Sequence, residues 1–585
     1  MLKNFLAQLL THKCILILAL LSIVSSVAAS YSAGFNLMMN VRLWPYLFWL
    51  LSIGLMLAAG WRSLKLDKKH LRSSLLWFAL FTALALPWRV VDTTHIPVCL
   101  SGDEGSAGLW ALNYLNGNAN NPFTIGWYSF PSMSNFLQAG SIALIGQTIP
   151  GLRLLSGVIG ALTAGAVYWL GRDLFGHKVG VLAAICMVGF HYHIHFSRIS
   201  LNNVWDSLFF CLSLAAFWSG WKRENRLLFI LSGLSAGLAL YFYETSKLLL
   251  LLLGLWIVCL AFSNPHKFKR CLPFLAFFAL AVFIVAFPLL RYYIEHSRQM
   301  LSHTDRFLFR NDWLALEAAK QGETQLAIFL RQWGKGLGAF ITVPLTFFYM
   351  PGTALLRPAE ALLFTGGLVL CIRFVRDPRA QMMLLWVLLF SCLGGFTEST
   401  PASQRYIGAA PVCMLGVALA LRFIETWLRK QRFTQKTPLW LFTVVVAVFL
   451  ARADIIFYFQ EYTPASDYGG IGARIETALA ENLNAIPGEK NVYYWGYPQI
   501  AYGSISVLPF LAPTAHGYDM DEFSETGTIP EPAGEAKFFI FLAEDADLAR
   551  ITDAFPGGTL TREEDRTGRF LFWQYAVIEP WLENR

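Results

Sequence analysis

Two adjacent carboxylates, Asp103 and Glu104, stand in a glycine-flanked segment directly after an apolar run that is long enough to cross a membrane. A positioned carboxylate can act as a general base, and its neighbour can hold a metal ion or orient an acceptor. The pair also has a structural alternative, because acidic side chains are favoured in the first turn of a helix, here expected at 105–115. Asp103 and Glu104 are therefore the candidate catalytic pair, with helix capping as the competing interpretation.

The composition indicates an integral membrane protein. Of the 585 residues, 56% are hydrophobic and 14% are charged, and the mean hydropathy is +0.48. Repeated apolar runs of about 20 residues are typical of transmembrane helices. The net charge of +8 does not indicate a nucleic-acid partner, because the basic residues form short clusters between apolar runs, as cytoplasmic loops do. The cysteines show neither a disulfide framework nor a metal-binding spacing.

The apolar runs predict about 13 transmembrane helices. They lie at 14–30, 43–61, 73–91, 152–171, 179–196, 199–218, 227–243, 247–263, 271–290, 357–376, 381–397, 404–424 and 438–456. Segments 133–149 and 337–350 are interpreted as interfacial or re-entrant pieces, because a crossing by either one would reverse the side of every later basic cluster. The basic clusters then share the cytoplasmic side, at 62–72, 222–226, 267–270, 373–379 and 429–436. Residues 1–29 resemble a signal peptide, and their cleavage is left open.

This topology divides the chain into two domains. Residues 1–458 form a transmembrane module with long outer loops at 92–151 and 291–356, and residues 459–585 form a small extracytoplasmic α/β domain. In the second domain, helices are expected at 471–483 and 546–555, and strands at 491–495, 537–542 and 570–577. The predicted location is the plasma membrane, with the N-terminus in the cytoplasm and the C-terminal domain outside.

Three cations, Arg198, Lys247 and Arg405, stand in the short outer turns, where few other basic residues occur. Each could be an interfacial anchor whose charge reaches the lipid headgroups. Together they favour an anion site on the outer face. An acid and several cations at a membrane surface suit a polyprenyl-phosphate sugar, because arginine and lysine bind its phosphate and a carboxylate deprotonates the acceptor hydroxyl. Tyr128, in an aromatic segment of the first loop, could stack on a sugar or belong to an aromatic belt.

A set of motifs follows in order along the chain. They are Gly102-Asp103-Glu104-Gly105 with Ala111-Leu112 and Gly117, Arg153-Leu154-Leu155-Ser156, Tyr168-Trp169-Leu170-Gly171-Arg172, His195-Phe196-Ser197-Arg198, Leu231-Ser232-Gly233 with Gly237, Thr245-Ser246-Lys247, and Arg405-Tyr406 with Pro411. Over about 90–425 the chain resembles the protein O-mannosyltransferase-like GT-C glycosyltransferases, a superfamily that includes the aminoarabinose lipid A transferases.

The resemblance implies a fold and a reaction. It implies that Asp103 is the catalytic acidic residue of the first outer loop and that transfer from a polyprenyl-phosphate sugar inverts the anomeric carbon. It also implies that Arg198, Lys247 and Arg405 neighbour the donor phosphate. Further candidate substrate contacts are Tyr128, Asn202, Asn203, Glu244 and Tyr406. The expected partners are the lipid-linked donor, a glycan, lipid or protein acceptor, and membrane lipids.

The chain departs from the family pattern at one place. Relatives often carry an acid a few residues after the arginine that matches Arg198, whereas this chain has Asn202 and Asn203 there and its first acid is Asp206. No cofactor is firmly predicted, and a divalent metal ion with unknown ligands stays open. His193 and His195 could be ligands, but a spacing of two places them on different faces of a helix, so interfacial histidines are preferred.

Two other functions compete with sugar transfer. A secondary transporter would be expected to show inverted repeats and broken helices near the membrane midplane. The sequence shows neither, and its ionisable residues gather at the outer ends of the spans. A non-catalytic glycan-binding membrane protein is the other alternative, against which the retained Asp103, Arg198 and Lys247 argue.

Overall fold

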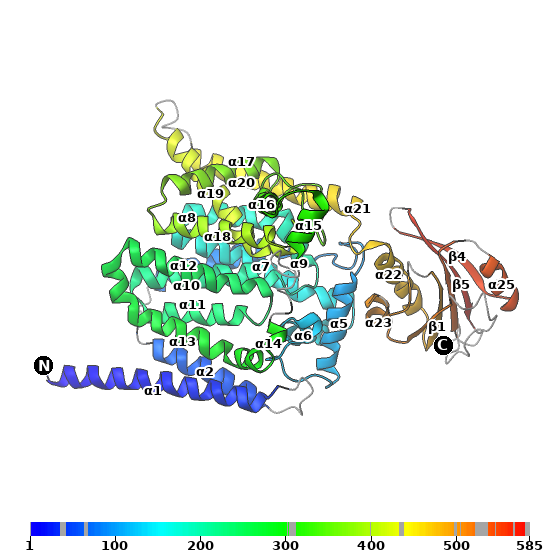
Figure 1. Ribbon diagram of the computed structural model, residues 1–585, viewed down its shortest axis with the longest axis horizontal. Coiled ribbons are helices and arrows are strands. Elements are labelled where there is room, and N and C mark those ends of the chain that lie inside the picture. Colours follow the sequence, from blue (N-terminus) through cyan, green and yellow to red (C-terminus); the bar gives the residue numbers. More distant parts are fainter. Residues whose placement is uncertain are drawn as a thin grey trace.

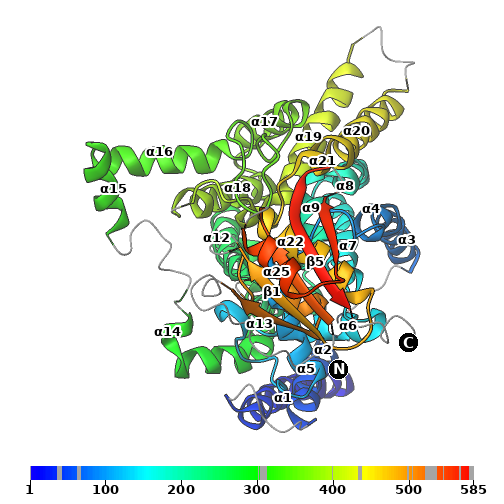
Figure 2. The same cartoon turned by 90° about the vertical axis from the view of Figure 1, so that its right-hand side faces the viewer.

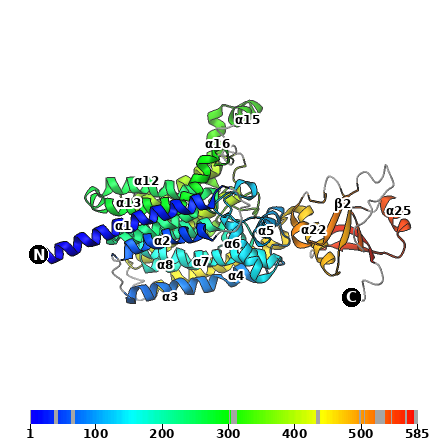
Figure 3. The same cartoon turned by 90° about the horizontal axis from the view of Figure 1, so that it is seen from below.

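The chain folds into a bundle of long helices with a small α/β domain at one end (Figure 1). The computed structural model describes residues 2–35, 43–61, 63, 68–300, 302, 312–397, 399–431, 438–496, 500–503, 505–520, 536–543, 546–565 and 568–578. The N-terminus lies at the end of the bundle away from the α/β domain (Figures 1 and 3). The predicted architecture, a polytopic helical membrane protein with a small C-terminal α/β domain, is confirmed.

All thirteen predicted spans fall on helices. The bundle contains α1 (Leu2–Ala33), α2 (Trp44–Trp61), α3 (Lys68–Ala85), α4 (Pro87–Val90), α5 (Gly102–Leu115), α6 (Met133–Ile145), α7 (Ile149–Phe175), α8 (His177–Gly189), α9 (His191–Arg198), α10 (Val204–Arg223), α11 (Arg226–Ala239), α12 (Lys247–Ser263), α13 (Pro265–Glu295), α14 (Ser297–Met300), α15 (Trp313–Gln321), α16 (Gln325–Gly338), α17 (Pro358–Arg373), α18 (Pro378–Gly395), α19 (Ala410–Leu428), α20 (Leu439–Ile456), the π-helix η7 (Phe457–Tyr462) and α21 (Thr463–Ala465). In the part of the chain that the structure describes, nine helical segments are long and apolar enough to cross a membrane, and the pair α8–α9, bent by 56°, is a tenth. The other predicted spans, α10, α11 and α17, are helices that do not meet this criterion of length and composition.

The outside of the bundle is apolar, as a lipid-facing surface requires. Leu20 of α1 and Leu76 of α3 are both 62% exposed, whereas the most apolar stretches of α7 and α19 are 72% and 78% buried. A helix that is apolar all round is either buried or a membrane span. The central α7 and α19 therefore carry the core, and the outer helices present leucines to lipid.

The two ambiguous segments do not form spans. α6 has 13 residues, which is about 20 Å of helix and less than the hydrocarbon thickness, and it packs between α5 and α7. α15 and α16 form an arm that projects from the bundle (Figure 2), and an irregular segment with a bridge from Thr346 to Ala402 follows. Residues 62, 64–67 and 432–436 of the predicted basic clusters lie outside the described residues.

The C-terminal domain is a mixed five-stranded sheet. Its strands are β1 (Lys490–Trp495), β2 (Ala515–Asp519), β3 (Ala536–Phe541), β4 (Thr559–Glu564) and β5 (Phe570–Ile578), in the order β2-β1-β3-β5-β4. β1 runs parallel to β2 and β3, and β5 runs antiparallel to β3 and β4. The helices are α22 (Gly470–Asn484), α23 (Val507–Leu511) and α25 (Ala546–Ala554). The sequence predicted α22, α25, β1, β3 and β5, but not β2, β4 or α23.

The sheet has a core on each face because side chains alternate along its strands. Val492 and Phe538 pack with Leu479 of α22 on one face. Phe539 and Ile551 of α25 belong to the core on the other face. The α22 side of the sheet is also the side that meets the helical bundle, which brings this domain to the first outer loop (Figure 1).

Candidate active site

The first outer loop begins α5 with a capping box. The Ser101 hydroxyl accepts a hydrogen bond from the Glu104 N–H at 3.3 Å, and the Glu104 carboxylate accepts one from the Ser101 N–H at 3.1 Å. This reciprocal arrangement satisfies two backbone donors at the start of the helix. The capping interpretation therefore applies to Glu104, and it fixes the direction in which α5 leaves the loop.

The Glu104 carboxylate is held more tightly by Arg153 of α7. The Arg153 guanidinium donates from Nε and from Nη2, at 2.8 Å each, to the two carboxylate oxygens, and both side chains are wholly buried. The Ser200 N–H and the Tyr468 hydroxyl add hydrogen bonds of 2.7 and 2.8 Å. Burial alone would raise the pKa of Glu104, but the charge and hydrogen bonds of Arg153 outweigh it and hold this pKa below its usual value. Glu104 is thus a fixed anion that positions the loop.

Arg198 supports the same loop from the end of α9. It donates to four backbone carbonyls, those of Ile96 at 3.1 Å, Trp88 at 2.9 Å, Val91 at 2.8 Å and Asp92 at 3.0 Å. These bonds use four of its five N–H groups, and its side chain is buried. This geometry gives Arg198 a positioning role in the loop, and the phosphate-binding role that the resemblance implies stays a prediction.

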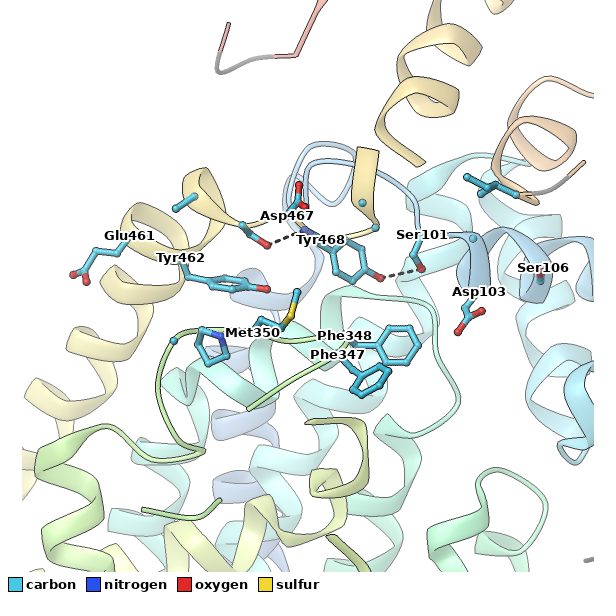
Figure 4. A pocket seen from close by; sticks show the side chains of 18 of the residues that line it. Ser101, Asp103, Ser106, Phe347, Phe348, Met350, Glu461, Tyr462, Asp467 and Tyr468 are labelled. Carbon is cyan, nitrogen blue, oxygen red and sulfur yellow. Dashed lines mark hydrogen bonds between the residues drawn. The ribbon is translucent and has the colours of Figure 1, made fainter. Parts of the chain in front are cut away.

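Asp103 faces a cavity, unlike its neighbour. The cavity has a volume of about 920 Å³ and lies between the first loop, the segment 347–352, η7 and the C-terminal domain (Figure 4). Its polar lining includes the side chains of Asp103, Ser106, Glu461, Tyr462, Asp467, Tyr468 and Ser506. Phe347 and Phe348 lie on the other side of it from Ser101 and Tyr468 (Figure 4). In the described part of the chain, this lining contains carboxylates but neither lysine nor arginine.

Lys247 begins α12, and Arg405 ends a short 3-10 helix at Ser403–Arg405. Lys247 forms an ion pair with Glu244, and its ammonium lies 5.7 Å from the ring centre of Tyr293. Its side chain is 45% exposed, so an incoming anion could reach it. Arg405 donates to the hydroxyl of Thr397. The structure therefore places Asp103 on the cavity and these two cations outside the cavity lining.

The aromatic segment 127–130 of the first loop packs against the turn that contains Glu244. Tyr128 is 55% exposed and has a left-handed backbone, with φ 51°. The ring of Phe130 in the same loop lies 5.5 Å from that of Tyr243, which precedes Glu244. The structure thus brings three predicted substrate contacts, Tyr128, Glu244 and Lys247, into neighbouring segments.

The other predicted contacts lie away from the cavity of Asp103. Asn202 donates to the Phe242 carbonyl at 2.8 Å, and Asn203 is 1% exposed. Tyr406 is wholly buried and donates to the Gly336 carbonyl at 3.1 Å. None of these three side chains lines the cavity of Asp103, and their role as substrate contacts stays a prediction.

The three alternating histidines of α9 are buried, so the expectation that they are interfacial is wrong. His191, His193 and His195 are all 0% exposed, because the bend after α8 turns α9 into the bundle. Neighbouring histidines face different ways, as the spacing of two predicts, whereas His191 and His195 face the same segment, 348–349. The partners of the three histidines are the Tyr349 hydroxyl at 2.6 Å, Arg89 at 3.4 Å and the Phe348 carbonyl at 2.9 Å, respectively.

Comparisons with known proteins bear on the fold of the chain. Residues 129–291 match the family model of the dolichyl-phosphate-mannose-protein mannosyltransferases. The crystal structure of ArnT from Cupriavidus metallidurans bound to undecaprenyl phosphate superposes with a TM-score of 0.53 and 13% identity, covering 86% of this chain and 98% of that chain. The chain has the GT-C glycosyltransferase fold. The resemblance drawn from the ordered motifs is thereby confirmed.

A second GT-C structure is similar over much of the chain. The archaeal oligosaccharyltransferase AglB from Archaeoglobus fulgidus, in complex with an inhibitory peptide and a dolichol-phosphate, gives a TM-score of 0.49 and 14% identity, covering 87% of this chain and 74% of that chain. No curated protein sequence matches the chain significantly.

The C-terminal domain docks directly on the helix that carries Asp103. A Cβ at Gly105 of α5 would lie 2.4 Å from the carbonyl oxygen of Ser506, and one at Gly108 would lie 2.6 Å from the ring of Phe510. The Ser106 and Ser506 hydroxyls hydrogen-bond at 2.8 Å. Glycine at both α5 positions is therefore what permits this close approach, and the domain forms one wall of the cavity in this GT-C protein.

Sequence reasoning missed two residues that shape the site. Arg153 stands near the start of α7, whose other charged residues lie in its last turn, and an arginine inside a span is a signal of a buried partner. Tyr468 gave no such signal, because it follows the last span in an ordinary polar stretch. Its hydroxyl nevertheless joins the C-terminal domain to both Ser101 and Glu104, at 3.2 and 2.8 Å.

Proposed function

We propose that this protein transfers a sugar from a polyprenyl-phosphate donor to an acceptor hydroxyl, with Asp103 as the general base. The observation that carries the proposal is the difference between two neighbouring carboxylates. Asp103 lines an open cavity, whereas Glu104 is buried and held by Arg153. One carboxylate is in a position to exchange a proton with a substrate, and the other fixes the helix on which the first one stands.

The proposed reaction is a single displacement. The acceptor hydroxyl gives its proton to the Asp103 carboxylate while its oxygen forms a bond to the anomeric carbon. The bond from that carbon to the phosphate oxygen breaks, and the lipid phosphate leaves with the electron pair. Attack opposite to the leaving group inverts the anomeric carbon. A phosphate leaving group needs charge stabilisation more than it needs a proton.

We propose that Lys247 and Arg405 supply this charge. Lys247 is half exposed and forms an ion pair with the carboxylate of Glu244. A donor phosphate would replace this carboxylate as the partner of the Lys247 ammonium. Arg198 would act indirectly, by fixing the position of residues 88–96, whose backbone carbonyls accept its hydrogen bonds. A lipid-phosphate donor is supported by the description of the matching family and by the undecaprenyl phosphate bound to ArnT.

The acceptor is proposed to enter through the cavity, since the C-terminal domain forms its wall. Ser506 and Asp467 of that side and Ser106 of α5 offer hydroxyl and carboxylate groups, which bind the hydroxyls of a glycan, lipid or protein acceptor. We place this cavity and the C-terminal domain outside the plasma membrane, with the N-terminus in the cytoplasm, because the basic clusters fall at the other ends of the spans.

Comparative mass spectrometry tests the proposed function. Surface glycans, glycolipids and glycoproteins are profiled in cells with the wild-type gene, without it, and with Asp103→Asn in its place. Loss of one sugar of fixed mass from one acceptor class, in both the deletion and the Asp103→Asn strain, is the expected result. Identical profiles in all three strains would contradict a transferase, and restoration by Asp103→Asn would contradict the base.

A further inference from the structure

A second cluster of ligating side chains lies inside the bundle, apart from Asp103. His191 at the start of α9, Glu360 in the first turn of α17 and Asp454 near the end of α20 come from three distant parts of the chain. Each offers one ligand atom, and these atoms all lie within 4.8 Å of one another. The three residues are 0%, 2% and 1% exposed, so the cluster is closed to solvent.

The cluster contains a polar atom without a partner. Among the described residues, Nε2 of His191 has no hydrogen-bond partner, whereas the Glu360 carboxyl interacts with the Asp454 carboxyl and the Arg357 backbone. Burying a polar group without a hydrogen bond is unfavourable by roughly 1–3 kcal/mol, so native proteins almost always satisfy such groups. The unsatisfied nitrogen of His191 therefore points to a bound species within the cluster.

The charges of the cluster favour a cation. Arg357 lies beside it, with Nη1 3.7 Å from Oδ1 of Asp454, and also donates to the Ala453 carbonyl at 2.9 Å. One guanidinium does not neutralise the two carboxylates of Glu360 and Asp454. A buried excess of negative charge must be removed either by a bound cation or by a proton shared between the carboxyl groups. The contact between the carboxyl groups of Glu360 and Asp454 fits either arrangement. A shared proton would leave the imidazole nitrogen of His191 unsatisfied, whereas a cation would bind it.

The surroundings orient the imidazole as a ligand. Nδ1 of His191 is 2.6 Å from the Tyr349 hydroxyl, and the His191 backbone N–H donates to Oδ2 of Asp454 at 3.2 Å. Metal-binding histidines usually make such a hydrogen bond with the ring nitrogen that does not hold the metal, which fixes the ring. Nε2 is thereby left as the ligand atom.

We propose that His191, Glu360 and Asp454 bind a divalent cation of the zinc type. One imidazole and two carboxylates form a mixed nitrogen and oxygen set that suits zinc and similar first-row ions. Metal–ligand bonds of about 2.0–2.2 Å keep ligand atoms within about 4.4 Å of one another. The ligand atoms of the cluster lie within 4.8 Å of one another, so small side-chain movements would bring them to a common ion. The ion would join α9, α17 and α20.

The proposed metal site lies behind residues that line the cavity of Asp103, so a bound ion would fix the position of these residues. The ring of Phe457 packs edge-on against His191 at 5.2 Å and also lines the cavity. Tyr349, which holds the imidazole, directly follows Phe347 and Phe348 of the same lining. The ion therefore has a structural role, holding the cavity wall opposite Asp103, and the inference does not depend on the reaction proposed above.

Metal analysis of the full-length protein tests the proposal. The protein is purified in detergent from cells grown with zinc, dialysed, and measured by inductively coupled plasma mass spectrometry. We expect about one zinc per chain in the wild type and an at least roughly tenfold loss in His191→Asn and in Glu360→Gln. His193→Asn is the matched control, a buried histidine of the same helix outside the cluster, and should retain the metal. Zinc retained by both ligand variants, or absent from the wild type, would overturn the proposal.

A measurement on the wild type alone covers the case in which a variant fails to fold. Thermal unfolding is followed before chelation, after treatment with a strong chelator, and after addition of zinc chloride. The melting temperature should fall on chelation and recover with zinc, because a ligand that binds the native state stabilises it. If the melting temperature changes neither on chelation nor on addition of zinc, and no metal is bound, the carboxyl groups of the cluster share a proton and the cation site is refuted.

Discussion

The buried pair of Arg153 and Glu104 gives a quantitative test of how the first loop is held. Arg153→Met removes two hydrogen bonds of 2.8 Å to Glu104 and leaves that carboxylate buried with only neutral donors. Breaking one side of a buried pair costs about 3–5 kcal/mol. Adding Glu104→Gln removes the stranded charge. The double variant should therefore be more stable than the sum of the single effects predicts, by about 1–3 kcal/mol.

The assay is equilibrium unfolding of the four proteins in one detergent, giving the free energy of unfolding of each. Glu104→Gln should cost less than Arg153→Met, because Arg153 keeps its bonds to the carbonyls of Thr93 and Cys99, at 2.8 and 2.6 Å. Since the pKa of Glu104 is depressed, the pair stabilises the protein above the unfolded pKa of about 4.3, and this stabilisation is lost as the pH falls through the lower folded pKa. Two results would contradict this prediction. One is that the losses of unfolding free energy in the two single variants add exactly in the double variant, and the other is that the double variant loses stability at low pH as the wild type does.

Three further predictions concern other parts of the molecule. Burial raises the pKa of Glu476 to about 8, so the native state holds a proton that the unfolded chain releases. The free energy of unfolding should therefore fall as the pH rises toward 8, by up to about 1.4 kcal/mol per pH unit. Glu476→Gln should flatten this pH profile, as measured by thermal unfolding. A profile as steep as the wild type's would contradict it. Lys247→Gln and Arg405→Gln should each weaken binding of a polyprenyl-phosphate donor by about 2 kcal/mol or more in a titration of the folded protein; unchanged affinity in both would make them simple anchors. Single cysteines at Asp92 and Asp467, whose side chains are 46% and 59% exposed, should react with an impermeant thiol reagent in intact cells, and reaction only after permeabilisation would invert the topology.

The helices and the first carboxylate could be predicted from sequence because their signals are local. A run of about 20 apolar residues has one stable form in lipid, and all thirteen predicted spans are helical. Asp103 stands out because it lies in a glycine-flanked turn beyond a span. By contrast, β4 was missed because its residues are mostly polar or exposed, as expected of an edge strand, and β2 because His516 and Gly517 interrupt any strand pattern.

The partners of the site could not be predicted, because they are distant in sequence. Glu104 meets Arg153, 49 residues away, and Tyr468, 364 residues away, and only the folded chain brings them together. The same holds for Arg198, whose charge suggested an anion site. Its bonds go to backbone carbonyls, which no sequence pattern marks. Local patterns therefore identify a charged residue but not whether a substrate or the protein itself uses the charge.

The most direct test of the account is the transfer rate of Asp103→Asn. The substitution keeps the size of the side chain and its tolerance at a helix start, while it removes the basic carboxylate. Glu461→Gln is the control, because it neutralises another carboxylate of the same cavity. With a polyprenyl-phosphate sugar donor and a membrane extract as acceptor, the account predicts a loss of about 10²–10⁴-fold for Asp103→Asn and little change for the control. A folded Asp103→Asn protein that transfers sugar at the wild-type rate would contradict the central claim.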